Sequence, residues 1–154
     1  MATSAICNSF KQELLAMTPH TAADVYKILL IKAAPTGTYN ASVTNVGTPG
    51  TGSPTTSNVG TDEVAASGTY ASGGATLAGF SATLQTSTGC LDFTSPITFT
   101  GATISASAAI IYNSSRSNKA VAVIDFGGTI TSTAGTFTVN LPAVGAGTSL
   151  IRVA

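Results

Sequence analysis

The sequence predicts an all-β protein: an antiparallel β-sandwich of Ig-like or jelly-roll-like topology, with a short N-terminal helix and a long Gly/Thr-rich arm. From Asp62 onward, runs of β-branched and aromatic residues are separated by turn residues about every dozen positions, which is typical of sandwiches and barrels. Strands do not alternate with helices, so a parallel sheet is disfavoured. With 154 residues, 44% of them hydrophobic, the chain predicts one domain with its own core.

The first segment, residues 4–17, has the pattern of an amphipathic helix. Ser4 is a candidate N-cap, and Ile6, Phe10 and Leu14 follow at helical spacing. Pro19 ends the pattern because proline restricts the residue before it. A helix this short is marginal alone, so its apolar stripe should dock on the β-domain or on a neighbouring subunit.

Residues 25–34 predict the first strand. Tyr26, Ile28 and Leu30 are expected to share one face of it, between lysines that punctuate the run. A helix is the competing interpretation of this apolar stretch.

Residues 35–60 differ in composition from the rest of the chain, being rich in Gly, Thr, Ser, Pro and Asn. A stretch of this length without periodicity indicates a functional loop or a mobile arm. We expect an extended arm that orders on a partner, with Tyr39, Val43, Val46 and Val59 as its apolar contacts.

The remaining strands are expected within residues 61–154, which form the main β-domain together with strand 25–34. Asn113 to Ser115 and Gly127-Gly128 are expected to be turns between them. The expected strands are residues 76–84, 90–93, 96–99, 104–112, 120–126, 136–141 and 149–153.

Charged residues make up only 8% of the chain, against a usual share of about a quarter, and the formal net charge is zero. A surface with so few charges repels copies of itself weakly and favours association. Six basic and six acidic residues, without a basic run, disfavour nucleic acid as a partner. No apolar stretch is long enough to span a membrane, and the N-terminus lacks the pattern of a signal peptide.

The residues that carry chemistry are few. His20 is the only histidine and has no acidic or Cys neighbour in sequence, so we interpret it as a surface residue in a turn. The pair Asp62-Glu63 is interpreted as a solvated turn or strand start, and Asp125 as a structural acid that bonds a turn or pairs with Arg116 or Lys119. We therefore expect no enzyme, no cofactor and no metal site.

The two cysteines, Cys7 and Cys90, are too few for a disulfide framework and lack the spacing of a metal site. Two buried free thiols are the preferred interpretation. A bridge within the chain or between subunits is the alternative.

Several stretches resemble small virion proteins of tailed bacteriophages. The most specific runs from Ile110 through Tyr112-Asn113 into Asn118-Lys119-Ala120-Val121-Ala122-Val123-Ile124-Asp125-Phe126-Gly127. The others are Gly68 to Leu77, Ala134 to Val139, Ser9 to Leu15 and Tyr26 to Leu30. The resemblance covers most of the chain except residues 35–60. It implies a structural protein, including capsid decoration or cement proteins, and no catalytic residues.

Composition and resemblance together lead us to expect a non-enzymatic capsid decoration protein on the virion surface, made in the host cytoplasm. Its partners would be the major capsid protein and itself, as a homotrimer or homodimer. The expected assembly contacts are Ile6, Phe10, Leu14, Tyr39, Val43, Val46 and Val59.

Three alternatives stay open at this point. The first is a tail, neck or head-fibre subunit. The second is a carbohydrate-binding module, for which Tyr39 and Tyr70 would be the residues to test. The third is a hydrolase in which His20 is the base.

Overall fold

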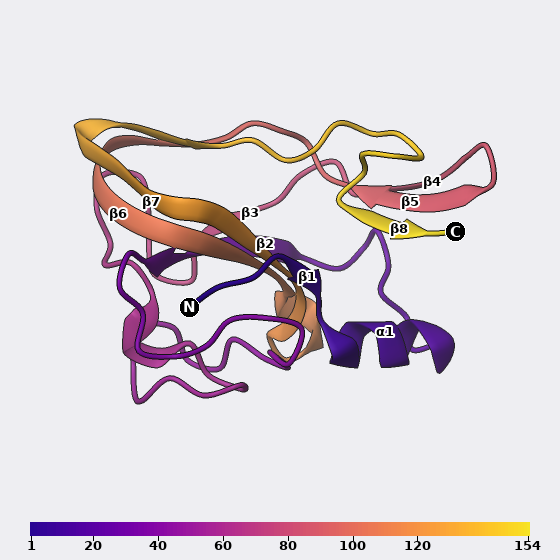
Figure 1. The fold of residues 1–154 in the computed structure, drawn as a ribbon, viewed down its shortest axis with the longest axis horizontal. Coiled ribbons are helices and arrows are strands. Elements are labelled where there is room, and N and C mark those ends of the chain that lie inside the picture. Colours follow the sequence, from indigo (N-terminus) through magenta and orange to yellow (C-terminus); the bar gives the residue numbers. More distant parts are fainter.

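The computed structural model describes all 154 residues and contains two antiparallel sheets and one short helix (Figure 1). The five-stranded sheet has the order β1-β7-β6-β2-β3, and the three-stranded sheet has the order β4-β5-β8. The prediction of a β-rich fold with a single short helix is confirmed, whereas the Ig-like or jelly-roll-like sandwich is not. The elements are β1 (Ala5–Ile6), α1 (Asn8–Leu15), β2 (Tyr26–Lys32), β3 (Ala75–Thr76), β4 (Ser81–Gln85), β5 (Thr88–Asp92), β6 (Ile97–Asn113), β7 (Lys119–Val139), β8 (Ile151–Val153) and the 3₁₀ turns η1 (Gly60–Asp62) and η2 (Ser114–Arg116).

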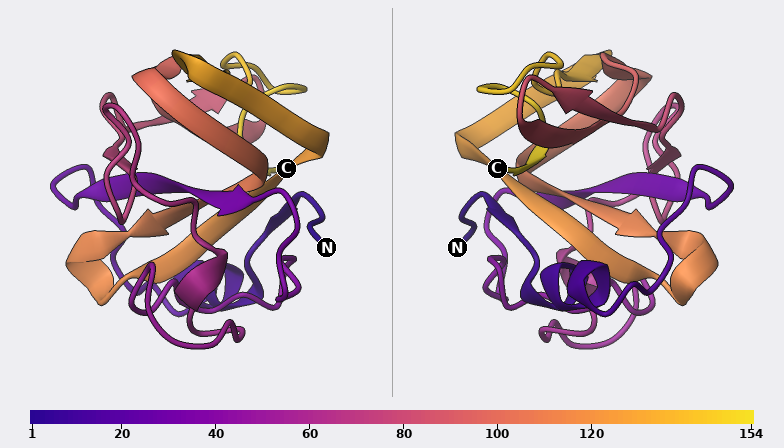
Figure 2. Two further views of the ribbon diagram at one scale, coloured as in Figure 1. Left: turned by 90° about the vertical axis from the view of Figure 1, so that its left-hand side faces the viewer. Right: turned by 90° about the vertical axis from the view of Figure 1, so that its right-hand side faces the viewer.

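The centre of the fold is one long hairpin of β6 and β7, which twists across the molecule (Figure 2). Its turn holds Ser117 and Asn118 in the left-handed backbone region. The sequence predicts four strands here, separated by turns. Gly101 and Gly127, both with positive φ, instead lie at interruptions of the register, so the two strands continue past them.

Burial divides this hairpin into two halves. Residues 108–113 of β6 are all buried, whereas residues 98–107 alternate between buried and exposed positions. β2 pairs with the buried half, and its residues 28–31 are fully buried. Tyr26, Ile28 and Leu30 alternate along β2 and share one face as expected, and Leu29 and Ile31 on the other face are buried too, so both faces of this part of the sheet are covered.

Helix α1 begins later than the sequence predicts. Ser4 does not cap it: the Ser4 hydroxyl accepts a hydrogen bond from the Asp125 backbone N–H at 2.9 Å, and the helix begins at Asn8 after an extended Cys7. Residues 5 and 6 instead pair with β7 as β1. Residues 5 and 6, which the sequence assigns to the helix, therefore form an edge strand of the large sheet.

Residues 35–60 do not project as an arm; they fold back beneath the large sheet (Figure 1). Tyr39, Val46 and Val59 belong to the main core cluster and are 0–1% exposed. Backbone bonds join Thr3 N to Tyr39 O at 2.9 Å and Val46 N to Asn118 O at 3.1 Å. The predicted arm is thus not confirmed, because its scattered apolar residues cover one face of the large sheet.

The small sheet lies beyond one end of the large sheet, above α1 in the view of Figure 1. A cluster of three aromatic rings links the two sheets. Tyr26 of β2 stacks on Phe80, with ring centroids 5.1 Å apart, and Phe93 lies 5.2 Å from the Tyr26 ring. These ring contacts bury apolar surface between the two sheets.

Candidate functional site

A polar cluster surrounds His20, where the loop after α1 meets the β6–β7 turn. The His20 side chain is 1% exposed, and its Nε2 lies 2.8 Å from Glu13 Oε2. Its Nδ1 lies 3.2 Å from Asn113 Nδ2, and its ring packs edge-on against Phe10. The interpretation of His20 as a surface residue without an acidic neighbour is wrong, because the helix brings Glu13 onto it.

Two further ion pairs complete this cluster. Lys119 at the start of β7 pairs with Glu13, and the Arg116 Nε donates to Asp24 Oδ2 at 3.2 Å. Burial alone would raise the pKa of Asp24, but hydrogen bonds from Asn113, the Thr21 N–H and Arg116 outweigh it and lower that pKa to about 2.

The geometry favours a structural role for this cluster. Both ring nitrogens of His20 are hydrogen-bonded within the protein, so neither is free to take a proton from a substrate. A hollow of about 320 Å³ beside it is lined by seven residues, none of them hydrophobic. The cluster holds α1 and residues 18–25 onto the hairpin turn.

A second polar cluster is centred on Asp62, which is 0% exposed. Its carboxylate accepts hydrogen bonds from Gly37 N at 2.7 Å, Thr36 N at 3.0 Å and the Tyr39 hydroxyl at 2.8 Å, and pairs with Lys32 Nζ at 3.0 Å. Burial would raise the pKa of Asp62, but these donors lower it to about 2. The interpretation of Asp62 as a solvated turn residue is therefore wrong.

Glu63, 6% exposed, organises the next loop in the same way. Its carboxylate accepts hydrogen bonds from the Tyr70 hydroxyl at 3.1 Å, the Ser72 hydroxyl at 2.7 Å and the Gly73 N–H at 2.5 Å. Tyr70 in turn accepts from Leu30 N at 3.0 Å, so the loop is tied to β2. Asp62 and Glu63 thus anchor two glycine-rich segments whose backbone would otherwise lack partners.

The side chain of Asp125 makes a local contact only. Its Oδ1 accepts from Gly127 N at 3.0 Å, while Arg116 and Lys119 pair with other acids. The expected turn hydrogen bond is confirmed. The expected pairing with Arg116 or Lys119 is absent.

The expected assembly contacts lie mostly inside the protein. Leu14 is 40% exposed and Ile6 is partly buried, whereas five of the seven residues are at most 1% exposed: Phe10, Tyr39, Val43, Val46 and Val59. A contact through these five would require the segments that carry them to leave the core.

All four tyrosines are likewise buried, at 3% exposure or less: Tyr26, Tyr39, Tyr70 and Tyr112. The two proposed for carbohydrate stacking, Tyr39 and Tyr70, hydrogen-bond to Asp62 and Glu63 instead.

Cys7 and Cys90 are buried free thiols, and burial raises the pKa of Cys7 to about 12.

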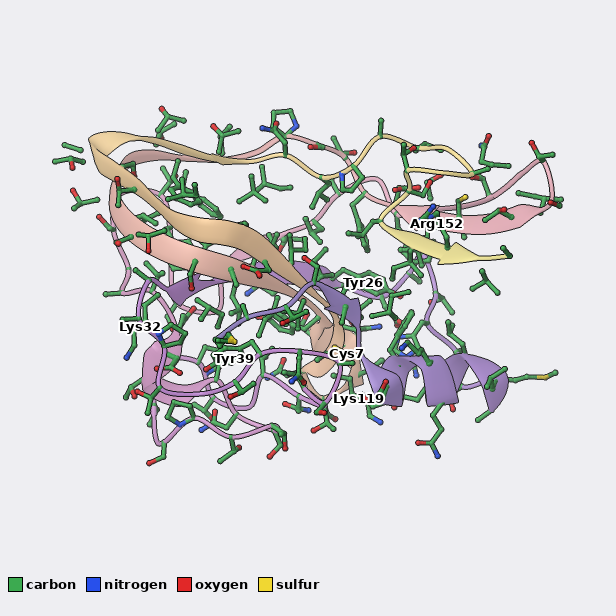
Figure 3. All side chains as sticks on the ribbon, viewed as in Figure 1. Cys7, Tyr26, Lys32, Tyr39, Lys119 and Arg152 are labelled. Atoms are coloured by element: carbon green, nitrogen blue, oxygen red, sulfur yellow. The ribbon has the colours of Figure 1, made fainter.

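One part of the molecule, which we call the uncharged region, consists of residues 76–91, 93–107 and 126–151. None of these positions is Asp, Glu, Lys, Arg or His. They form β4, β5 as far as Leu91, the distal parts of β6 and β7 and the loop before β8, in the upper part of Figure 1. In Figure 3, Lys32 and Lys119 lie below this region, and Arg152 lies at its border on β8.

An apolar groove of about 350 Å³ runs between α1 and the small sheet. Leu14 and Phe10 line it from the helix, and Leu84 and Val153 line it from β4 and β8. Leu84 is 72% exposed and Val153 is 62% exposed, so large apolar side chains face solvent here. No single sequence pattern signalled this groove, because its residues come from three separate segments.

Comparisons with protein-family models, with curated proteins and with solved structures found no match. No helix is long and apolar enough to cross a membrane. No group of three or more His, Cys, Asp or Glu residues is placed to hold a metal ion.

Proposed function

We propose that this chain is a non-enzymatic structural subunit of a bacteriophage virion, a decoration or cement protein that binds the head shell and stabilises it. The observation that supports this best is the uncharged region. It occupies one side of the molecule, and Asp92, the one charged residue between its segments 76–91 and 93–107, is buried, while Glu13, Asp62 and Glu63 are buried elsewhere.

An uncharged, hydroxyl-rich surface suits association on physical grounds. Burying an unpaired charge at an interface has a large desolvation penalty, whereas Thr and Ser hydroxyls can donate or accept and adapt to many partners. A surface of this kind also lacks the like-charge repulsion that keeps free soluble proteins apart. Both properties favour a subunit that functions within an assembly.

In this proposal the partners are the major capsid protein and other copies of the chain. Each contact is modest, and stabilisation of the shell comes from many copies that each bind the assembled form. Because residues 35–60 lie in the core, the proposed contact surface moves from the predicted arm to the uncharged region. An Ig-like or jelly-roll-like sandwich stays a prediction.

The experiment is to separate heads from tails on a density gradient and to count the copies of this chain in each fraction by mass spectrometry. Hundreds of copies on heads are expected. A few copies, or copies on tails alone, would replace the cement proposal with a tail, neck or fibre subunit. Absence from both fractions would remove the virion proposal.

A matched pair of variants tests the role of the uncharged region. Thr138→Lys places a charge on an exposed position of β7, and Lys11→Gln removes one from the exposed face of α1. Head occupancy should fall for Thr138→Lys and stay unchanged for Lys11→Gln. Equal occupancy for both variants would show that the shell contact lies elsewhere.

A further inference from the structure

The strand edges of this protein differ in how well they are protected against pairing with another chain. The outer strands β1 and β3 are only two residues long. The distal part of β7 is interrupted near Gly127 and Ala134, which have positive φ. β8 is three residues long and carries Arg152. Short length, bulges and charges are the usual devices that block edge pairing.

Strand β4 has none of these devices. It is five residues long, Ser-Ala-Thr-Leu-Gln, without a charge or a proline. Its register with β5 is unbroken from Ser81–Asp92 to Gln85–Thr88, and β5 is its only neighbour. It is therefore the longest regular open edge in the molecule.

The register fixes which backbone groups of β4 are free. In a two-residue hairpin the residues that flank the turn form a hydrogen-bonded pair, so Ser81, Thr83 and Gln85 bond to β5. Ala82 and Leu84 therefore direct their N–H and C=O groups outward. Neither residue makes a backbone hydrogen bond outside the sheet, and both are exposed.

The side chains beside this edge are apolar or uncharged. Leu84 is 72% exposed and lines the groove together with Ala82, and Thr83 is exposed. No charged residue occurs between Glu63 and Asp92 in the sequence, and Asp92 is 3% exposed. A second copy brought against this edge would meet neither a like charge nor a charge that loses its hydration.

We propose that β4 pairs with β4 of a second copy, antiparallel and about a two-fold axis at Thr83, to form a continuous six-stranded sheet. In this register Ala82 of one protomer hydrogen-bonds Leu84 of its partner and the reverse, so every open group on both edges is satisfied. The two Leu84 side chains then each lie beside the Ala82 of the other protomer and extend the apolar groove across the axis.

A second copy is the occupant that these observations favour. Two copies of this edge can approach without charge repulsion, because β4 contains no charged residue. The symmetric register leaves no free group at either β4, whereas an added peptide would expose a new open edge of its own. The β4 edge is thus our candidate for the contact between copies that the proposed function includes. This contact can form without the head shell.

The test is the mass of the isolated protein by light scattering at roughly 100 μM, where even a micromolar interface is occupied. Wild-type protein should be a dimer. Thr83→Lys and Thr83→Asp should each be monomeric, because two like charges would face one another in the central pair. An equal mixture of the two variants should restore dimers, since opposite charges then meet across the axis.

Thr131→Lys, which adds the same charge at an exposed position of β7, is the control and should stay dimeric. Circular dichroism and the urea midpoint establish that each variant is folded. A monomeric wild type, dimeric Thr83 variants, or a mixture that fails to dimerise would each overturn the proposal. Because no virion is used, this proposal and the head-shell proposal can fail independently.

Discussion

At the scale of single residues, the protein buries four of its six acidic side chains, and these accept hydrogen bonds inside the fold. Asp62 accepts from two backbone N–H groups and a tyrosine and pairs with Lys32, and Asp24 joins Asn113 to Arg116. These carboxylates satisfy loop backbone that has no sheet partner. These acidic residues therefore bind groups inside the fold and contribute little charge to the surface.

Replacing Asp62 with Asn tests this use. Asn keeps the shape of the side chain but presents an NH₂ group to donors, so at least one buried N–H or hydroxyl loses its acceptor. We expect a loss of about 2–4 kcal/mol in the free energy of unfolding, measured by urea denaturation. Asp125→Asn is the matched control: it keeps the oxygen that accepts from Gly127 N and should change stability by less than about 0.5 kcal/mol. Equal effects for both variants would contradict the assigned role of Asp62.

The pKa values predict how stability depends on pH. The pKa values of Asp24 and Asp62 are about 2 in the folded protein, below the ordinary value of 3.8. A lowered folded-state pKa means that the stabilisation is complete well above pH 3.8 and is lost as the pH falls from there towards 2. Urea midpoints measured across this range should fall steeply in wild type and less steeply in Asp62→Asn. A flat profile would show that these carboxylates are not stabilised in the folded state.

At the scale of elements, the glycine-rich segments are ordered by what they pack against. Residues 35–60 place Val46 and Val59 in the core, and Asn58 bonds four backbone groups of the same segment through its side chain. At Gly74, with a φ of +74°, a Cβ would overlap the Ile28 carbonyl, so only glycine allows this loop to approach β2. Composition alone suggested mobility, whereas packing makes these loops part of the fold.

Limited proteolysis tests the order of residues 35–60. Thermolysin is suitable because it cleaves before apolar residues, and the segment contains no Lys or Arg for trypsin. We expect cleavage near Val43, Val46 and Val59 to be no faster than global unfolding, because these side chains are buried. Val46→Ala should lower stability by about 2 kcal/mol and accelerate cleavage. Rapid cleavage of the wild type within this segment would restore the mobile-arm prediction.

At the scale of the whole molecule, the charged residues and the uncharged region lie in different parts of the structure. Lys32 and Lys119 pair with acids in the lower part (Figure 3), whereas β4 and the distal hairpin carry no charge and the only charged residue of β5, Asp92, is buried. The lower part is thus held by buried ion pairs and hydrogen bonds, and the upper part presents backbone edges, hydroxyls and exposed apolar side chains. This separation underlies both the proposed shell contact and the proposed dimer.

The separation predicts that self-association is insensitive to salt. Coulomb interactions between exposed charges are screened as the Debye length falls from about 10 Å at 0.1 M to about 3 Å at 1 M salt. A β4–β4 interface without charges should therefore keep its dissociation constant within about twofold over this range, by sedimentation equilibrium. A shift of tenfold or more would locate charged residues in the interface and contradict the β4 assignment.

The sequence by itself determined the secondary structure class and much of the strand pattern. Alternation and β-branched runs placed β2, β5 and the strongest part of β7, and proline and Asn-Ser residues marked the end of the helical segment and the β6–β7 turn. These features depend on local backbone geometry, and residues close in the sequence determine that geometry. The lengths of β6 and β7 were missed, because only cross-strand pairing decides whether a glycine ends a strand or forms a bulge.

Only the tertiary structure decided which residues are available to a partner. The sequence assigned an outward contact to Tyr39, Val43, Val46 and Val59, but these residues lie in the core. They pack against the apolar face of the large sheet and bury it. His20 and Glu13 are seven positions apart and meet only when α1 docks beside the hairpin turn. The open edge of β4 is defined by its single neighbour. Burial and edge exposure are relations between distant segments, so no local pattern carries them.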